Sequence, residues 1–318
     1  MGVNSMSIID LHCDTIYQLT NNKALNLKEN NLAIDINKLK SAGSLAQFFA
    51  LFIDLNEHNK PFNRAMDMLN RFYEEIEKNH HDIEVARNYN ELTSNEAEGK
   101  ISGFLTIEEG EAVEGSIKNL RNFYDLGVRL ITLTWNYENS IGYPNCKKEF
   151  MNKGLKPFGI DMVEEMNKLG MIIDVSHLSD GGFYDVARYS NKPFIASHSN
   201  SRLLCNHSRN LKDDMIKVIS NKGGVIGINF EKSFLVEDGS RSSVEDMINH
   251  IKHIYKIGGK DVISIGSDFD GINPDNLEIG DMSQINKLIC GLELAGFNGE
   301  LIDKILYKNA LRVIKEVL

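Results

Sequence analysis

The stretch "IIDLHCDT" (residues 8–15) begins as an apolar run and ends in side chains that can bind a metal ion. Its first four residues fit a buried strand, and His12 and Asp14 follow at the end of that strand. Residues i and i+2 of a strand point to the same face, so we expect the His12 imidazole and the Asp14 carboxylate to project together. The stretch therefore predicts a strand that carries a nitrogen ligand and an oxygen ligand at its end.

Short apolar runs rich in β-branched and aromatic residues recur along the chain. There are eight: "SIIDLH" (7–12), "FFALFID" (48–54), "GFLTIE" (103–108), "VRLITLTW" (128–135), "MIIDVSH" (171–177), "PFIASHS" (193–199), "GVIGINF" (224–230) and "VISIGSDFD" (262–270). Continuous apolar runs are typical of parallel strands buried on both faces. Helical patterns separate most of them, so the sequence predicts an α/β fold, a (β/α)8 TIM-type barrel. No linker or low-complexity segment interrupts the alternation, and we expect residues 1–318 to form one domain.

Two of the predicted helices have clear end signals. A helix is expected over residues 157–169, because a proline opens it and a glycine follows it. Ser242 with Glu245 resembles a capping box and predicts the start of a second helix. His250 and His253 lie one turn apart on that second helix, where a solvated face is favoured over a further metal site.

Composition and charge exclude several classes of partner. The formal net charge of the 318 residues is −10, with 42% hydrophobic and 25% charged residues, and no basic cluster stands out. Nucleic acid and membrane are therefore poor partners, and no apolar run reaches the roughly 20 residues that a membrane span needs. No secretory signal is recognised, and the four scattered cysteines favour free thiols in a reducing cytoplasm. We expect a cytoplasmic protein.

Side chains that can bind metal follow five of the eight predicted strands. They are His12 and Asp14, Glu108 and Glu109, His177, His198, and Asp268 and Asp270. Functional groups of a (β/α)8 barrel gather at the carboxyl ends of its strands, so these side chains are expected to meet. One histidine at a strand end would more often be structural, but three of them with carboxylates indicate a metal centre.

The number and kind of these side chains indicate the chemistry of the centre. Imidazole and carboxylate ligands suit zinc, iron or manganese. Five or six ligands exceed one tetrahedral ion and favour two ions about 3.5–4 Å apart that share a carboxylate. Such a centre generates hydroxide near neutral pH and polarises a carbonyl, so we expect hydrolysis.

Some of these positions have alternative roles. Glu108 and Glu109 alternate along a strand, so only one of them can face the barrel axis. Asp270 is also suited to holding the "DFDG" turn. Asp174 lies three residues before His177 and should face away from it, so a role behind another ligand is possible but is not favoured.

Eight motifs occur together in one order along almost the whole chain. They are "DLHCDT", "IEEGEA", "LGVRLITLTWN", "GLKPFGIDMVEEMN", "DVSHLSD", "ASHSNSR", "SRNLKDD" and "GSDFDG". In this set the sequence resembles the membrane dipeptidase (renal dipeptidase) family of zinc metallopeptidases, within the amidohydrolase superfamily. The resemblance implies that His12 and Asp14 bind the first of two Zn2+ ions and that His177 and His198 bind the second. It also implies that Glu108, rather than Glu109, bridges them.

The resemblance also implies the roles of three further residues. Arg209 would hold the substrate carboxylate, and Asp268 would carry the proton between the water and the leaving amine. Trp135 stands where the animal enzymes of the family have a histidine that helps to bind the substrate. An indole can donate one hydrogen bond but cannot shuttle a proton, so this departure bears on substrate scope and rate.

The sequence is therefore interpreted as a zinc-dependent dipeptidase with two Zn2+ ions per chain, although other divalent transition metals fit the same ligands. A metal-bridging hydroxide is expected to attack the peptide bond of short peptides with a free C-terminal carboxylate. The alternatives are another binuclear-metal amidohydrolase, such as an N-acyl amino acid deacylase, an amidase or a lactonase, and a barrel that binds a ligand without catalysis. The expected partner is a small peptide substrate, and a homodimer is left open.

Overall fold

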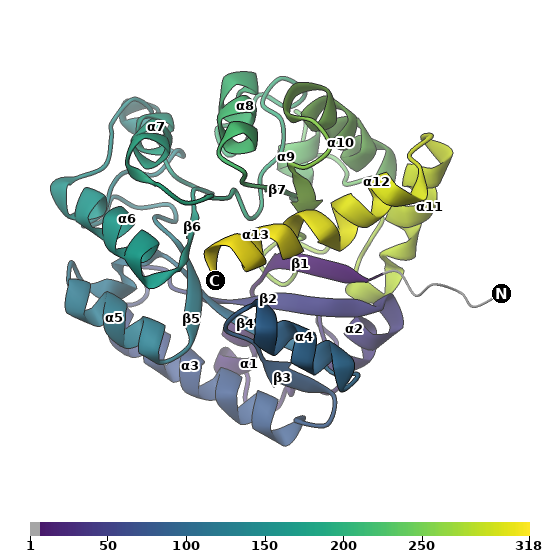
Figure 1. Ribbon diagram of the computed structural model, residues 1–318, viewed down its shortest axis with the longest axis horizontal. Helices are drawn as coiled ribbons and strands as arrows, with labels where there is room; N and C mark the ends of the chain where they lie inside the picture. Colours follow the sequence, from purple (N-terminus) through teal and green to yellow (C-terminus); the bar gives the residue numbers. More distant parts are fainter. Residues whose placement is uncertain (1–6) are drawn as a thin grey trace.

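Parallel strands close into a barrel inside a ring of helices in the computed structural model, which describes residues 7–318 (Figure 1). The strands are β1 (Ile8–Cys13), β2 (Ser44–Phe52), β3 (Ile83–Val85), β4 (Ile101–Glu108), β5 (Val128–Thr132), β6 (Ile172–Asp174), β7 (Ile226–Ile228) and β8 (Ile263–Ile265). The hydrogen-bonded order is β6-β5-β4-β2-β1-β8-β7, and β3 pairs with β4 outside this path. The predicted α/β barrel is confirmed.

The ring of strands closes through the segment that contains the sixth predicted run. Asp174 at the end of β6 pairs in parallel with Ile195, and Ala196 pairs in parallel with Ile226 at the start of β7. The segment makes only these isolated bridges, yet it occupies the sixth position of the barrel. All eight apolar runs expected as strands therefore lie in the barrel wall, and β3 is an addition to it.

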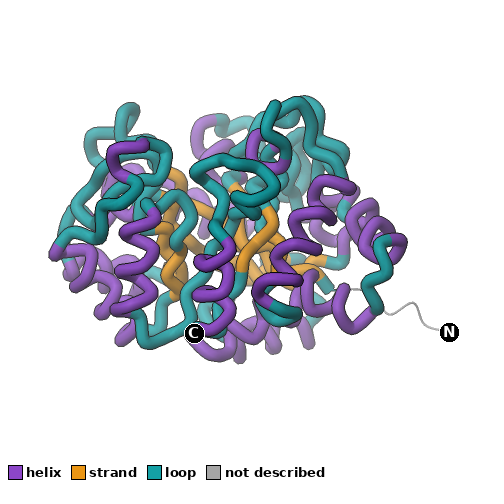
Figure 2. The backbone as a smooth tube through the Cα atoms, turned by 90° about the horizontal axis from the view of Figure 1, so that it is seen from above, coloured by secondary structure: helices purple, strands orange, loops and turns teal. Residues whose placement is uncertain are grey.

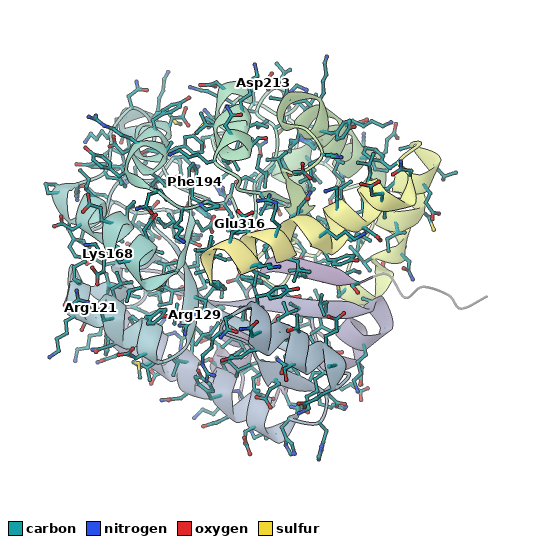
Figure 3. All side chains as sticks on the ribbon, in the orientation of Figure 1. Arg121, Arg129, Lys168, Phe194, Asp213 and Glu316 are labelled. Atoms are coloured by element: carbon teal, nitrogen blue, oxygen red, sulfur yellow. The ribbon has the colours of Figure 1, made fainter. Side chains whose placement is uncertain are left out.

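Helices follow the strands around the outside, and Figure 2 shows the strands enclosed by them. The helices are α1 (Thr15–Asn21), α2 (Ile36–Ala42), α3 (Pro61–Lys78), α4 (Tyr89–Ala97), α5 (Ile117–Asp125), α6 (Pro157–Leu169), α7 (Asp180–Tyr189), α8 (Asp213–Asn221), α9 (Lys232–Leu235), α10 (Val244–Gly258), α11 (Asn286–Leu294), α12 (Gly299–Asp303) and α13 (Asn309–Val317). Phe194 lies inside the ring of helices, whereas Arg121, Lys168 and Asp213 belong to the outer helices α5, α6 and α8 (Figure 3).

The C-terminal helix α13 covers the barrel, and Figure 1 shows it lying across the strands. One apolar cluster joins Val313 and Ile314 of α13 to side chains of the strands, among them Phe48 and Phe104, whose rings stack with centroids 4.7 Å apart. A larger cluster packs the outer helices against the wall of the barrel. The apolar packing of α13 leaves the carboxyl ends of the strands for polar side chains.

Of the two helices predicted from their end signals, one is confirmed as predicted and the other begins one residue later. The helix expected over 157–169 is confirmed, and Gly170 after it has the left-handed φ of 74°. The capping box is shifted by one residue, because Ser243 rather than Ser242 caps α10 and accepts a hydrogen bond from the Asp246 N–H. A serine and an acidic residue three positions apart occur in both registers, so spacing alone could not separate them. Among the described residues, no helix is long and apolar enough to cross a membrane.

Candidate metal centre

The carboxyl ends of the barrel strands bring one compact group of imidazoles and carboxylates together. The group contains His12, Asp14, Glu108, His177 and His198, with Asp268 beside them, in three overlapping sets of three side chains that could hold a metal ion. All six side chains belong to residues that are at most 9% exposed. These are the five metal ligands and the proton carrier expected from the sequence, drawn from strands far apart along the chain.

Glu108 lies between two pairs of the other side chains. Its Oε2 atom is 3.3 Å from His12 Nε2, which is in turn 3.5 Å from Asp14 Oδ2. Its Oε1 atom is 3.1 Å from His177 Nε2 and 3.4 Å from His198 Nε2. Each carboxylate oxygen therefore faces a different pair of ligand atoms, as a carboxylate that bridges two ions must.

The spacing of these atoms fits a metal centre. Ligand atoms about 2.0–2.2 Å from a tetrahedral ion lie roughly 3.3–3.6 Å apart, and the nitrogen–oxygen separations around Glu108, 3.1–3.4 Å, are close to this spacing. The two ring nitrogens of His177 and His198 that face Glu108 are 3.1 Å apart. Both nitrogens of the buried His12 ring have no hydrogen-bond partner among the described residues. Nitrogen and oxygen donors without a thiolate suit zinc, iron or manganese.

The other ring nitrogens of His177 and His198 indicate which atoms carry the protons. His177 Nδ1 is 3.2 Å from Asn136 Oδ1, and His198 Nδ1 is 2.6 Å from Ser197 Oγ. With each Nδ1 donating its proton to these oxygens, both Nε2 atoms direct lone pairs toward Glu108. Lone pairs and a carboxylate in such close contact repel one another unless a cation lies between them, so the residues fit a metal ion.

A buried hydrogen-bond network stands behind His198. Ser197 Oγ, the acceptor for His198 Nδ1, donates to Asp174 Oδ2 at 2.6 Å. Asp174 also accepts hydrogen bonds from Thr132 Oγ1 at 2.6 Å and from Ser176 Oγ at 2.8 Å. A role of Asp174 behind a ligand was not favoured from the sequence, yet the structure shows one. Through Ser197, Asp174 orients His198, as outer partners of metal ligands commonly do.

Turns rather than regular strand geometry place three of the group. β1 ends at Cys13, and Asp14 has φ −103° and ψ 19° at the start of α1, so strand alternation does not position it as expected. His177 and Asp268 have left-handed φ values of 67° and 62°. Such conformations are unfavourable for residues with a Cβ and occur where the surrounding structure imposes them, often at functional sites.

A second buried aspartate, which sequence analysis did not single out, braces the turn before Asp268. Asp10 accepts hydrogen bonds from the Ser267 N–H at 2.8 Å, from Ser267 Oγ at 2.7 Å and from Gln47 Nε2 at 3.0 Å. Asn229 Nδ2 donates directly to Asp268 Oδ2 at 2.8 Å. An aspartate inside an otherwise apolar run, such as "IIDL", was the available signal for Asp10.

Burial and mutual interaction shift the proton affinities of the group. Burial alone would lower the pKa of His12, but the Glu108 and Asp14 carboxylates together raise it well above its ordinary value. Burial raises the pKa of Asp14 to about 6 and that of Asp268 to about 7. Burial, followed by the charge of Arg209, lowers the pKa of His177 to about 4. The same buried carboxylates that raise the pKa of His12 favour positive charge in this half of the centre.

A cavity of about 430 Å³ opens onto this group. Asp14, Glu108, His177 and Asp268 contribute to its lining, together with residues from the surrounding loops. The lining residues from those loops are Tyr17, Gln18, Phe52, Asp54, Glu57, Trp135, Asn136, Glu231, Ser233, Phe234, Asp270, Gly271, Ile272 and Asn273. The cavity is large enough for a small molecule to reach the candidate metal centre.

Trp135, expected to bind the substrate, lies in the wall of this cavity. Its ring packs edge-on against Phe52 with centroids 4.7 Å apart and lies 6.2 Å from the His177 ring. Its backbone N–H donates to Glu109 Oε2 at 3.0 Å, and Glu109 Oε1 accepts from Asn139 Nδ2. Glu109 thus faces away from the centre, and it anchors the loop that carries Trp135.

Arg209 lies beside the lining of the cavity rather than in it. It is 4% exposed, and its Nη2 donates to the His198 carbonyl at 3.0 Å. Its Nη1 lies 3.4 Å from Ser199 Oγ, and its Cζ lies 5.3 Å from the centre of the Phe234 ring. Its Nε has no hydrogen-bond partner among the described residues, and Arg209 forms no ion pair with a described carboxylate. The guanidinium is thus a buried cation next to the centre.

Two other polar side chains hold loops rather than the centre. Asp270 accepts hydrogen bonds from Thr15 Oγ1 at 2.6 Å and from the Ala33 N–H at 2.7 Å. His250 is 1% exposed and joins the Ser201 N–H to the Leu235 carbonyl. The predicted solvated face was therefore wrong for His250, because loops that are distant in the sequence cover this turn of α10.

Comparison with known proteins places the whole chain within one family of hydrolases. The family model described as membrane dipeptidase (peptidase family M19) matches residues 3–318. An uncharacterized dipeptidase of Schizosaccharomyces pombe is 32% identical over 332 residues, which cover 97% of this chain and 80% of that protein.

Solved structures give the same result. The structure of dipeptidase AC, a metallo peptidase of family M19, is 26% identical, with a TM-score of 0.91 and 99% of both chains covered. A metallo peptidase from Rhodobacter sphaeroides, liganded with a phosphinate mimic of the dipeptide L-Ala-D-Ala, is 26% identical with a TM-score of 0.90. It covers 99% of this chain and 100% of its own.

We predict that Ser197→Ala weakens Zn2+ binding about 10- to 100-fold, because His198 loses its link to Asp174. Competition with a chromophoric chelator measures the affinity. Ser264→Ala is the matched control, since its buried hydroxyl in β8 has no hydrogen-bond partner and its loss should leave the affinity unchanged. Wild-type affinity in the Ser197 variant would exclude the proposed orientation of His198.

The raised pKa values of His12 and Asp14 predict that metal binding releases protons. Ligand atoms must be deprotonated, so the apparent affinity should fall as the pH is lowered through about 6 and rise again on return to about 8. Calorimetric titration of the metal-free protein in two buffers of different ionisation enthalpy counts the released protons. Binding without proton release at about pH 6 would show that these two side chains are not ligands.

Proposed function

The chain belongs to the membrane dipeptidase family, peptidase family M19, and is a metal-dependent dipeptidase; from this premise we propose that it cleaves dipeptides with a free C-terminal carboxylate at two zinc ions. The observation that carries the proposal is the position of Glu108 between His12 and Asp14 on one side and His177 and His198 on the other. A carboxylate with both oxygens facing separate ligand pairs supports two ions rather than one.

Zinc is proposed because its tetrahedral coordination by nitrogen and oxygen agrees with the spacing of the five ligand atoms. Two bound zinc ions would supply a hydroxide as the nucleophile at neutral pH and would polarise the carbonyl of the peptide bond. His12 with Asp14 would hold the first ion, and His177 with His198 would hold the second. The remaining groups around the cavity then have to bind the substrate and move a proton.

Asp268 is proposed as the group that moves the proton. Its Oδ1 lies 3.8 Å from His12 Nε2, it lines the cavity, and Asn229 holds its other oxygen. Burial raises its pKa to about 7, which suits a carboxyl group that accepts a proton and then donates it near neutral pH. One side chain could thus take the proton from water and deliver it to the leaving amine.

Arg209 is proposed to bind the C-terminal carboxylate of the substrate. Arg209 does not form a surface ion pair with the nearby Asp213 or Asp214: Asp213 pairs with His253 at 2.7 Å, and Asp214 accepts from Tyr184. A buried guanidinium without a carboxylate partner is costly unless an anion completes the site. A free substrate carboxylate is such an anion, and it favours a dipeptidase over an amidase or a lactonase.

The opposite end of a dipeptide carries an ammonium group, and the cavity lining suits it. Asp54, Glu57 and Glu231 line the cavity, and none of them forms an ion pair with a described residue. Carboxylates of this kind attract a free amino terminus through Coulomb interaction. Together with Arg209, they support a substrate that is charged at both ends and therefore short.

A cytoplasmic location is part of the proposal. The four cysteines have free thiols; Cys13 and Cys205 are buried, and Cys146 and Cys290 are exposed. Free exposed thiols persist in reducing compartments, which supports the cytoplasm. Fractionation of the source cells, with recovery of the protein in the cytoplasmic fraction, tests this part.

We expect Asp268→Asn to lower kcat by about 100-fold or more, because the amide keeps the shape but cannot carry the proton. Metal content measured on the same preparation should stay near that of the wild type. Asp270→Asn serves as the comparison and should lower kcat less, since its carboxylate holds Thr15 and Ala33 rather than a reacting group. A metal-replete Asp268 variant with normal kcat would exclude its role as the proton carrier.

Arg209→Ala should lower kcat/KM for free dipeptides far more than for the same dipeptides with an amidated C-terminus. Loss of a buried, charge-assisted contact should cost about 2–4 kcal/mol for the free acid. Measuring both substrates with both proteins gives a double-mutant cycle. Coupling near zero would remove the carboxylate-binding role of Arg209 and favour a metal-dependent amidase of broader scope.

A further inference from the structure

Asn136 connects the candidate metal centre to the cavity. Its side-chain oxygen lies 3.2 Å from His177 Nδ1, and the residue also lines the cavity. It is half-buried and follows directly after Trp135 in the loop beyond β5. The residue therefore contacts both a predicted ligand and the space in which a substrate would lie.

The binding of a metal by His177 fixes the orientation of this amide. A neutral imidazole carries one proton, so a ring that binds a metal through Nε2 must carry its proton on Nδ1. That proton needs an acceptor, and only the oxygen of an asparagine amide accepts hydrogen bonds. Oδ1 of Asn136 must therefore face the ring, and Nδ2 is turned away from it. No described residue accepts a hydrogen bond from Nδ2.

The surrounding loop holds Asn136 in place. Glu109 accepts hydrogen bonds from the Trp135 backbone N–H and from Asn139 Nδ2, on either side of Asn136. The Asn136 carbonyl accepts a hydrogen bond from the Cys146 thiol at 3.3 Å. A donor that is already oriented before the substrate binds costs little reorganisation during the reaction, which is the requirement for stabilising a developing negative charge.

Resting on the proposed function, we propose that Asn136 is a further catalytic residue, whose Nδ2 donates a hydrogen bond to the carbonyl oxygen of the scissile peptide bond. Asn136 lines the cavity that opens onto the metal centre, so its Nδ2, which no described residue engages, is available to a substrate bound there. The hydrogen bond strengthens as the oxygen gains negative charge during attack by water. A single donor of this kind contributes about 10²- to 10³-fold to kcat in other hydrolases.

Asn136→Asp tests the proposal with a change of one functional group. The aspartate keeps an oxygen that can accept from His177 Nδ1 but has no N–H to donate. We expect kcat for a free dipeptide to fall about 100-fold or more, while two Zn2+ ions still bind with an affinity within a few-fold of the wild type. The affinity of a phosphinate dipeptide analogue, which imitates the tetrahedral species, should fall in parallel with kcat/KM.

Asn273→Asp is the matched control for the added negative charge. Asn273 lines the same cavity, and its Oδ1 accepts from the Asp275 N–H at 2.8 Å, which an aspartate would also do. Its kcat should stay within about threefold of the wild type, since the residue contacts no predicted ligand.

The outcomes separate this inference from the proposed function. A metal-replete wild type without activity on any dipeptide refutes the proposed function itself. An active wild type together with an equally active Asn136→Asp protein overturns the role of Asn136. Loss of Zn2+ binding in Asn136→Asp would also overturn it, because Asn136 would then act only by supporting His177.

Discussion

The repulsion among buried lone pairs around Glu108 is the constraint on which the rest of the site depends. The carboxylate lies within 3.4 Å of three imidazole nitrogens, and two of those nitrogens are 3.1 Å apart. Such a group is stable only when protons or metal ions supply positive charge. The raised pKa of His12 is consistent with protons in this role, and two divalent ions would supply the same positive charge with the geometry that the side chains already have.

Hydrogen bonds from the surrounding polar side chains keep this group in place, which apolar packing alone could not do. Asp174 and Ser197 orient His198, Asn136 accepts from His177, and Asp10 braces the turn that leads to Asp268. The apolar clusters hold the barrel and its helices together, while polar side chains support the strand ends. The barrel therefore supplies rigidity, and the loops after its strands supply binding groups such as Arg209.

Much of the fold and much of the candidate ligand group could be predicted, because both depend on patterns within short stretches of the sequence. Continuous apolar runs predicted the strands, and the side chains at the strand ends predicted which candidate ligands lie together. Long-range hydrogen bonds leave no local pattern. For this reason the predicted exposure of His250 was wrong, the support given by Asp10 was missed, and the support given by Asp174 was not favoured. The turn that presents Asp14 was also not predicted, because a bend after a strand depends on the packing around it.

The central claim is that Glu108 bridges two metal ions, and counting the ions tests it most directly. Native mass spectrometry of the metal-free protein titrated with Zn2+ resolves species with none, one and two ions. A bridging Glu108 predicts saturation at two ions in the wild type, and the loss of stable two-ion binding in Glu108→Ala. Saturation at one ion in the wild type, or two firmly bound ions in the variant, would contradict it.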